Sequence, residues 1–329
     1  MGLLSGAARL ARAVDQGFDT DQVWYHGSTH DIRGMKPNLL NPESHFGKGY
    51  YFTTSPADAS KNYAGMGPDL TQRIQIRAEQ IANDLDVDYD DPKALKQATE
   101  ELKGQSDGVI YPVITRSQKT FDISSDGDTF LDYKRPDLDP EDYLDEADGD
   151  IDLARDLAFE DSFNYEPEGD LVDFLNSLQR DPRIDETGRQ NLIAAILEEA
   201  QDDQGLSGRR LDQIIRGTEF YAEDEITGQL VNNEVYREAL ERSGFDSVVH
   251  DGDIFLNVSF NKNIEPGTKH KIVFAPENIR SINAEFDPQK TQSSNLLASP
   301  APAAIGAGLL AASSEPTTRD KAVAAGEVA

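Results

Sequence analysis

Negative charge is concentrated in one internal segment of this chain, and this concentration limits how the chain can fold. Residues 122–203 hold 27 acidic and 6 basic side chains, a net charge of −21, against −30 for all 329 residues. Carboxylates are rarely buried without partners, so this segment must keep most of its surface in water. Two of its stretches, DFLNSLQRD and RQNLIAAILEEAQDD, still space their apolar residues as helices do. We therefore predict a helical insertion with solvated acidic faces, not a purely disordered tract.

The regions on either side of the insertion have a different composition. Several short stretches there are rich in aromatic or β-branched residues and are bounded by glycine or polar turns, which predicts strands. These stretches are DQVWYHGS, GKGYYFTTS, GVIYPVITRS, FDSVVHDG, IFLNVSF and KHKIVFAP. In SPADASKNYA, Ser55 is a suitable helix cap and Pro56 suits the first helical position. NNEVYREALERSG predicts a further helix, which ends at Gly244.

These changes in composition divide the chain into five segments. We predict an N-terminal helix at 1–20, the first half of a core at 21–122, the acidic helical insertion at 123–217, the second half of the core at 218–289, and a flexible tail rich in small residues at 290–329. The insertion is expected to project between the strand at 108–122 and the helix at 234–243. The tail has an apolar stretch that is interrupted by Pro300 and Pro302 and is short for a membrane span, so we expect none.

Composition excludes several classes of function. A strongly acidic protein repels phosphate backbones, so we expect no strong direct grip on nucleic acid. The chain has no cysteine, which excludes disulfides, thiolate metal sites and a cysteine nucleophile. DGDID at 148–152 lacks the glycine that a calcium loop needs at its sharp turn, and we expect no metal. We find no secretory signal at the N-terminus.

The first motif with chemical content is YHGS, at the end of an expected strand. The imidazole of His26 can hydrogen-bond a ribose hydroxyl, and Gly27 lets a ligand reach the main chain. Ser28 adds a short donor and acceptor. The triplet alone is a weak signal, because a buried histidine at a strand end would have the same sequence.

The second motif is HFGKGYYFTTSPADASKNYA, at 45–64. Gly47 and Gly49 permit a close approach to the backbone, and the tyrosines offer flat faces on which a heterocycle can stack. An aromatic core strand is the alternative interpretation. The fixed order of the two motifs along the chain is harder to explain by core packing.

Taken together, these stretches resemble the ADP-ribosyltransferase fold in its diphtheria-toxin-like and poly(ADP-ribose) polymerase-like branch. YHGS resembles the first motif of that fold, and FGKGYYF followed by SKNY resembles the second. GVIYPVITRSQKTFDI is similar to the strand that follows, while EVYREALERSGFDSVVHDG and KHKIVFAPENIRSINAEFDP are similar to the closing helix, turn and strand. The resemblance covers 22–64, 108–122 and 234–288. The flanks look most like the ADP-ribosyltransferase domains of phage polyvalent proteins, which are thought to enter the host with the genome.

The resemblance implies an α+β fold, an ADP-ribosyltransferase-like split β-sandwich of two packed, mostly antiparallel sheets around a cleft. It also implies roles in binding NAD+, which is the substrate. His26 would hold the nicotinamide ribose, the Gly27 backbone would bond the nicotinamide carboxamide with help from Ser60, and Tyr51 and Tyr63 would sandwich the ring. Ser28 joins these residues as a binding residue, and no metal is required.

This sequence differs from the family pattern at the third signature position. The glutamate usually found before IVF corresponds to His270 when KHKIVFAPENI is aligned. Histidine can bond a ribose hydroxyl and act as a base near neutral pH, but it supplies no fixed negative charge. Glu265 and Glu277 lie nearby and would serve under a shifted alignment. We expect His26, Tyr51 and His270 to be the catalytic residues, and we expect transfer of single ADP-ribose units, not polymer synthesis.

Other residues receive plainer interpretations. We expect His30, His45 and His250 to be polar residues of loops or strand ends. Trp24 is expected to anchor packing beside the site. Arg280 is expected to be a structural ion-pair or capping residue, not a phosphate clamp.

The function that the resemblance implies is an NAD-dependent mono-ADP-ribosyltransferase, encoded by a phage, that modifies a host protein or nucleic acid and releases nicotinamide. It would work in the host cytoplasm and could be packaged in the virion and injected. The alternative is a catalytically inactive interaction or virion cargo protein, in which the acidic insertion imitates nucleic acid or docks a basic partner.

Overall fold

The computed structural model describes most of the chain, with gaps. The described residues are 6–29, 32–37, 40, 44–64, 68–85, 87–88, 91–103, 108–162, 167–200, 204–224, 226–252 and 264–297. His30, the expected strand IFLNVSF at 254–260 and the tail from 298 onward lie outside these ranges.

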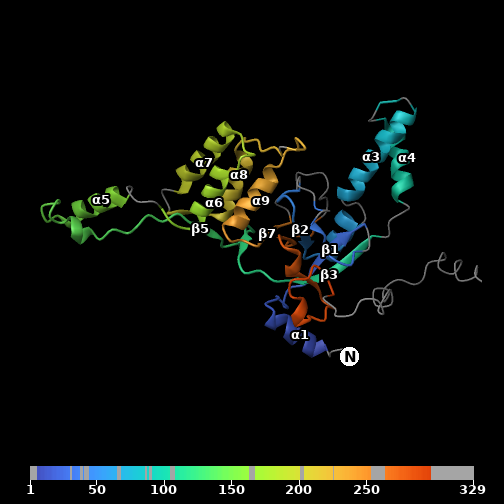
Figure 1. Cartoon of the computed structure of the whole chain (residues 1–329), viewed down its shortest axis with the longest axis horizontal. Helices are drawn as coiled ribbons and strands as arrows, with labels where there is room; N and C mark the ends of the chain where they lie inside the picture. Colours follow the sequence, from blue (N-terminus) through green and yellow to red (C-terminus); the bar gives the residue numbers. More distant parts are fainter. Residues whose placement is uncertain are drawn as a thin grey trace, which may run out of the picture.

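A mixed sheet forms the centre of the molecule (Figure 1). Its seven strands have the order β4-β7-β8-β2-β1-β3-β9. They are β1 (Trp24–Ser28), β2 (Tyr50–Thr53), β3 (Val109–Thr115), β4 (Thr120–Asp122), β7 (Ser247–Asp251), β8 (Lys269–Val273) and β9 (Ile279–Ser281). Neighbouring strands are antiparallel except for β4 and β7, which are parallel. The described strands of the core thus form one sheet, where the sequence predicted two packed sheets.

Helices account for most of the remaining structure, so the fold is α+β. Those outside the insertion are α1 (Gly6–Asp15), α2 (Pro56–Asp58), the π-helix η2 (Ala59–Ala64), α3 (Pro68–Leu85), α4 (Pro92–Lys103) and α9 (Asn232–Arg242), with short 3-10 turns η4 (Pro276–Asn278) and η5 (Pro288–Lys290). Those of the insertion are η3 (Pro140–Tyr143), α5 (Ile151–Ser162), α6 (Asp170–Arg180), α7 (Glu186–Ala200) and α8 (Gly208–Gly217). The insertion also holds a two-stranded sheet of β5 (Phe130–Asp132) and β6 (Gly205–Ser207).

Strand alternation gives the central sheet two different faces. Side chains on a strand point alternately to opposite faces, so Trp24, Phe52 and Val273 share one face and one apolar cluster. Tyr51 and Ile272, each one residue away in sequence, belong to the cluster on the other face. The sheet is therefore buried on both faces over β1, β2 and β8.

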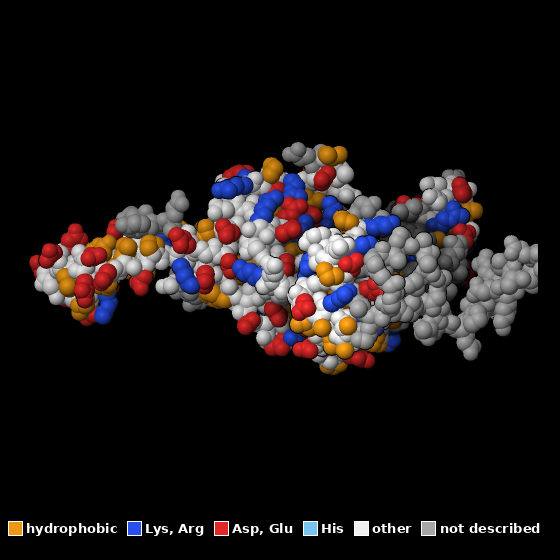
Figure 2. All heavy atoms as spheres, turned by 60° about the horizontal axis from the view of Figure 1, so that its bottom comes forward, with side chains coloured by type: hydrophobic (Ala, Val, Ile, Leu, Met, Phe, Trp, Pro, Cys, Tyr) orange, Lys and Arg blue, Asp and Glu red, His pale blue; other side chains and the backbone are white. Residues whose placement is uncertain are grey.

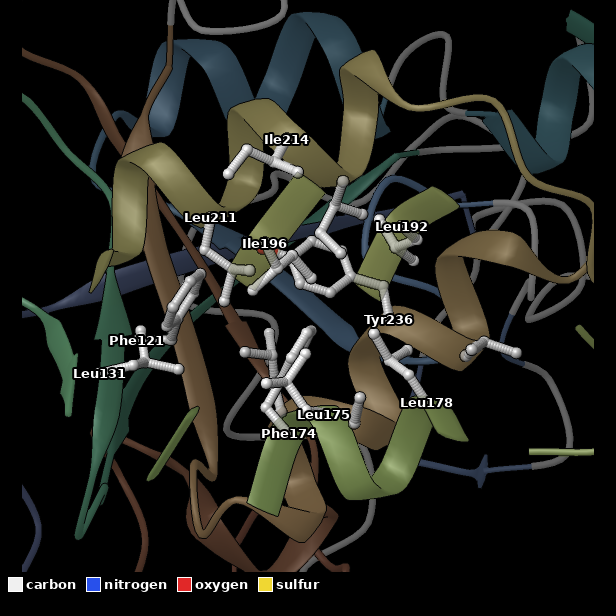
Figure 3. Packing of buried hydrophobic residues seen from close by; sticks show 14 of the residues in the cluster. Phe121, Leu131, Phe174, Leu175, Leu178, Leu192, Ile196, Leu211, Ile214 and Tyr236 are labelled. Atoms are coloured by element: carbon white, nitrogen blue, oxygen red, sulfur yellow. The ribbon is translucent and has the colours of Figure 1, made fainter. Parts of the chain in front are cut away.

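The larger apolar cluster joins the sheet to the acidic insertion. Figure 3 shows Phe174 of α6, Leu192 of α7 and Leu211 of α8 packed with Tyr236 of α9 and Phe121 of β4. All five side chains are nearly or fully buried. Helices α6, α7 and α8 of the insertion are thus part of the core of the protein, although the sequence predicted that the insertion would project between the strand at 108–122 and the helix at 234–243.

Among the described residues of the insertion, one part projects from the body of the molecule. The η3–α5 arm, residues 137–162, extends away from the body of the molecule in Figure 1, with α5 packed on η3. In Figure 2 its surface shows many acidic side chains beside apolar ones. Phe159 is 63% exposed there. The α3–α4 hairpin lies toward the opposite end and has a small apolar cluster of its own.

Candidate active site

The strand that carries His26 separates from its neighbour at the candidate site. Tyr25 and Thr53 are the one register pair between β1 and β2. Just beyond it, Nδ1 of His26 lies 2.9 Å from the carbonyl oxygen of Tyr51. A carbonyl only accepts hydrogen bonds, so Nδ1 carries the proton and Nε2 is left as an acceptor when the ring is neutral. The ring rests against Phe52, with ring centroids 5.6 Å apart.

The charge state of His26 follows from its surroundings. Burial lowers the pKa of His26, and the hydrogen bond to Tyr51 offsets only part of this effect. The imidazole is therefore neutral near pH 7. Its Nε2 lone pair can accept a hydrogen bond from a hydroxyl group such as that of a ribose.

Gly27 is required by the packing of the chain itself. A Cβ placed at Gly27 would come within 2.7 Å of the Cβ of Tyr63 and still closer to the carbonyl oxygen of Ala59. Strand β1 thus touches the backbone of η2 at this point, and only glycine fits. From the sequence, Gly27 was expected to let a ligand reach the main chain. The structure supplies this separate packing reason, and a bond to a nicotinamide carboxamide stays a prediction.

The second motif forms a loop clasped by α9. Gly47 has a φ of +55°, and a Cβ there would meet the backbone of Glu234 at 2.6 Å. The Lys48 N–H donates to the Glu234 carboxylate at 2.5 Å. Glu234 is buried and also accepts from Arg237 at 2.9 Å. The charged pair fixes the loop that leads into β2.

Tyr51 is held rigidly by that loop. Its hydroxyl donates to the Gly47 carbonyl at 3.0 Å and accepts from the Phe46 N–H at 3.0 Å. Burial raises the pKa of Tyr51 well above its ordinary value, although the hydrogen bond from Phe46 acts in the opposite direction. The phenol stays protonated, so Tyr51 can provide a ring surface but not a base.

Tyr63 and Ser60 lie on the short helices that follow β2. Ser55 caps α2, its Oγ accepting from the Asp58 N–H at 3.2 Å, and the chain continues into η2. Ser60 is exposed on η2, whereas Tyr63 is half-buried beneath β1. Burial, together with the negative charge of Asp58, raises the pKa of Tyr63. Single π-helical turns inside helices often mark functional sites.

His270 makes a contact that sequence reasoning missed. Its Nε2 lies 2.8 Å from Oδ2 of Asp58, and these two side chains are 6% and 1% exposed. The Asn62 amide donates to the other carboxylate oxygen at 2.6 Å. Burial alone would raise the pKa of Asp58, but hydrogen bonds from His270, Asn62 and Thr53 outweigh it and lower the pKa. An acidic residue in a first helical turn is so common that SPAD gave no sign of this partner.

Two further histidines surround this pair. The rings of His250 and His270 lie 5.2 Å apart, edge to face. Burial and the neighbouring His270 lower the pKa of His250 to about 3, and burial with Arg216 lowers that of His45 to about 4. The sequence predicted polar loop or strand-end positions for both. His45 does lie in a turn and His250 at the end of β7, but His250 is buried, with 2% of its surface exposed.

The alternative third-position residues are placed elsewhere. Glu265 is exposed in the turn before β8, where its carbonyl accepts from Thr268. Glu277 lies on η4, on the side of Tyr50, whose pKa is raised by burial and further by the negative charge of Glu277. Tyr50 is on the opposite face of the sheet from Tyr51. The structure thus brings His270, and neither glutamate, to the strand beside β2.

Trp24 and Arg280 have packing roles. Trp24 is 6% exposed, and Nζ of Lys271 lies 5.7 Å from the centre of its ring. The fully buried Arg280 donates to the carbonyls of Ile279, Lys290 and Thr291. These bonds attach the last described segment to β9.

A cavity of about 340 Å³ opens beside the second motif. His45 lines it together with Arg216 of α8 and Asn232 of α9. Arg216 is fixed by Asp212 at 3.0 Å and stacks over Phe46. The insertion therefore lines space adjacent to the loop that holds Tyr51.

Two features, a metal-binding cluster and a membrane-spanning helix, are absent from the described residues. No group of three or more histidine, aspartate or glutamate side chains in these ranges is arranged to hold a metal ion. No helix within them is long and apolar enough to cross a bilayer.

Comparison with known proteins found no match to any family model, curated protein or solved structure.

Proposed function

We propose that this chain is an NAD-dependent mono-ADP-ribosyltransferase that modifies a host macromolecule in the host cytoplasm and releases nicotinamide. One observation carries the proposal. The three residues that the family resemblance names as catalytic, His26, Tyr51 and His270, lie on the adjacent strands β1, β2 and β8. Tyr51 and His270 share one face of the sheet, and the His26 ring packs on Phe52 where β1 separates from β2. The three residues come from positions up to 244 residues apart in sequence (270 − 26).

The residues fit a substrate that combines ribose hydroxyls with an aromatic base. His26 presents a neutral imidazole whose Nε2 accepts a hydroxyl hydrogen bond. Tyr51 and Tyr63 supply protonated aromatic rings on the face of the sheet that carries His270. The Tyr63 ring lies 6.2 Å from that of His270, edge to face. Tyrosine rings can stack a nicotinamide, and Asp58 adds negative charge close to where positive charge develops on the ribose.

The proposal of single ADP-ribose transfer follows from His270, which stands at the third signature position of the family. Chain elongation in this family generally relies on the glutamate that His270 replaces. A buried imidazole can accept one proton per transfer but does not carry a permanent charge. The proposal is therefore limited to mono-transfer, with NAD+ as substrate and no metal.

Titration with NAD+ in a calorimeter tests the binding step. We expect wild-type protein to bind, and His26→Ala to weaken binding about 3- to 10-fold, since one hydrogen bond is lost. Tyr63→Ala should cost more, about 1–3 kcal/mol, because a stacking surface is removed. Phe159→Ser in the distant η3–α5 arm is the matched control and should bind as wild type does. Equal affinity in all four proteins, or no binding, would contradict the proposal.

A second candidate function is an interaction protein. It is favoured by the η3–α5 arm, which carries exposed Ile151, Leu153 and Phe159 among acidic side chains. Charge and apolar surface together suit a basic partner with an apolar patch. Capture of such a partner by wild type, lost in high salt and in a chain lacking 137–162, would support this function. Failure of the arm to retain any partner at low salt would oppose it.

A further inference from the structure

A buried imidazole–carboxylate pair occupies the position where the family resemblance places a single glutamate. Nε2 of His270 and Oδ2 of Asp58 are 2.8 Å apart, and both side chains are almost fully buried. They come from β8 and α2, which meet because Thr53 and His270 are register partners. The pair is thus fixed by the sheet itself.

Asp58 has a full set of partners, so the carboxylate is firmly oriented. His270 holds one oxygen, and Asn62 donates to the other at 2.6 Å. Because a carboxylate only accepts, Nε2 of His270 carries a proton and Nδ1 is the ring nitrogen that can take another. This is the arrangement by which a carboxylate orients a histidine base and stabilises the imidazolium that forms.

The surroundings of His270 place it beside the proposed nicotinamide site. The Tyr63 ring approaches it from η2 at 6.2 Å, and the His250 ring approaches it from β7 at 5.2 Å. Burial lowers the pKa of His250 to about 3, so that neighbour stays uncharged and leaves proton transfer to His270. One base, oriented by one carboxylate, therefore adjoins the ring that is expected to hold the leaving group.

We propose that His270 acts as a general base positioned by Asp58, and that the acceptor is a hydroxyl group on a protein. This inference rests on the proposed transferase function. In the step, the bond between the ribose C1′ and the nicotinamide nitrogen breaks, and its electron pair leaves with nicotinamide. An electron pair of the hydroxyl oxygen forms the new bond to C1′, and the hydroxyl proton moves to Nδ1 of His270.

The acceptor class follows from what an imidazole can do. A carboxylate acceptor has no proton to lose and needs no base. A guanidinium group holds its proton too tightly for imidazole to remove it, because its pKa is above about 12. A hydroxyl loses its proton as it attacks, and an oriented imidazole is suited to take it. The net charge of −30 disfavours a nucleic-acid acceptor, so the hydroxyl groups of serine, threonine and tyrosine side chains are favoured.

The test compares binding with turnover in four proteins. They are wild type, Asp58→Asn, His270→Gln and, as a matched carboxylate-to-amide control, Glu199→Gln. Glu199 forms an exposed ion pair with Arg210 on the insertion. In His270→Gln, the glutamine amide can still donate a hydrogen bond to Asp58. This variant therefore removes the base but keeps the hydrogen bond, and it still tests the inference if Asp58→Asn fails to fold. Labelled NAD+ is supplied with a bacterial lysate, and kcat and KM for transfer are measured separately.

We expect kcat to fall about 100-fold or more in Asp58→Asn and His270→Gln, with the KM for NAD+ changed by less than about threefold. Glu199→Gln should match wild type. Equal kcat in folded variants and wild type would overturn the inference while leaving the transferase function intact. Wild type that neither binds NAD+ nor transfers label would overturn both.

Fragmentation mass spectrometry of the labelled proteins tests the acceptor class. The expected result is ADP-ribose on serine, threonine or tyrosine side chains. Label confined to aspartate, glutamate or arginine, or to nucleic acid, would overturn the assignment of the acceptor.

Discussion

The candidate site and the acidic insertion solve the problem of polar residues in opposite ways. At the site, several polar groups are buried or half-buried, and each of these is held by a named partner: His26 by Tyr51, Asp58 by His270 and Asn62, and Glu234 by Arg237. In the insertion, most carboxylates face water while apolar side chains enter the common core, and the buried Asp181 and Asp212 are paired with arginines. The insertion therefore depends on a pattern of residue types, whereas the site depends on individual residues at individual positions.

The difference teaches how much each region tolerates. Burying a charge is costly unless its partners are in place, so a site built from such groups fails when one member changes. Exposed ion pairs contribute little, so the acidic surface of the insertion tolerates change. Within the insertion, only residues that reach the shared core should matter for stability.

The largest effect is expected at Gly27. In Gly27→Val, the new side chain would overlap Ala59 and Tyr63, and neither can move without shifting η2 from β1. We expect a loss of more than about 4 kcal/mol in the free energy of unfolding. Urea denaturation measures it, with Gly217→Val at the end of α8 as the control for added bulk in open space. A similar midpoint for both variants would show that β1 does not touch η2.

A pair of phenylalanines within the insertion provides the next test. Phe174 of α6 is fully buried in the shared core, while Phe159 of α5 is 63% exposed. Phe174→Ala should lower the free energy of unfolding by about 3–5 kcal/mol, and Phe159→Ser should change it by less than about 0.5 kcal/mol. Thermal unfolding compares the two. If Phe174→Ala left the melting temperature unchanged, the insertion would be an appendage and not a part of the core.

The buried histidines predict how stability depends on pH. His45 and His250 have pKa values lowered from 6.5 to about 4 and about 3, so below pH 6.5 the unfolded chain binds protons that the folded chain does not. Stability from these groups is therefore complete above pH 6.5 and is lost as the pH falls toward 3. Asp58, whose pKa is lowered, adds a further loss below its ordinary value of 3.8.

Removing His250 should reduce that dependence. In His250→Asn, the decline in melting temperature between pH 6.5 and pH 4 should be shallower than in wild type, since one buried imidazole no longer has to be protonated on unfolding. A curve with the same slope would mean that the acidic residues of the insertion, and not the buried histidines, dominate acid sensitivity.

The smallest effect is expected where a charge on the insertion surface is neutralised. Glu199→Gln breaks an exposed ion pair with Arg210, and the melting temperature should not change measurably. A measurable loss would contradict the view that the insertion depends on its apolar pattern alone.

Local patterns allowed several elements to be predicted from the sequence. The expected strand around WYHGS is β1, the expected helix start at Pro56 is capped by Ser55, and NNEVYREALER is α9. Each of these signals is contained within a few residues. The expected strand GVIYPVITRS is β3, and it contains Pro112, a residue type found mainly at sheet edges or bulges. Pro112 lies just before Val113, where the pairing of β3 with β9 begins.

The remaining features depend on contacts between distant residues. The parallel pairing of β4 with β7 joins residues more than a hundred positions apart, so no local pattern predicts it. Asp58 looked like a routine first-turn acid until β8 placed His270 against it. The two glycines, Gly27 and Gly47, were interpreted as ligand contacts, because the sequence does not reveal that η2 and Glu234 press against them.

The central claim is tested most directly by following both halves of NAD+ at once. NAD+ labelled on adenine and on nicotinamide is incubated with a bacterial lysate and either wild-type protein or His26→Ala. The account predicts that wild type moves the adenine label onto macromolecules while releasing the nicotinamide label in equal amount, and that His26→Ala does so far more slowly. Neither label moving with folded wild-type protein, or both labels remaining together, would contradict it.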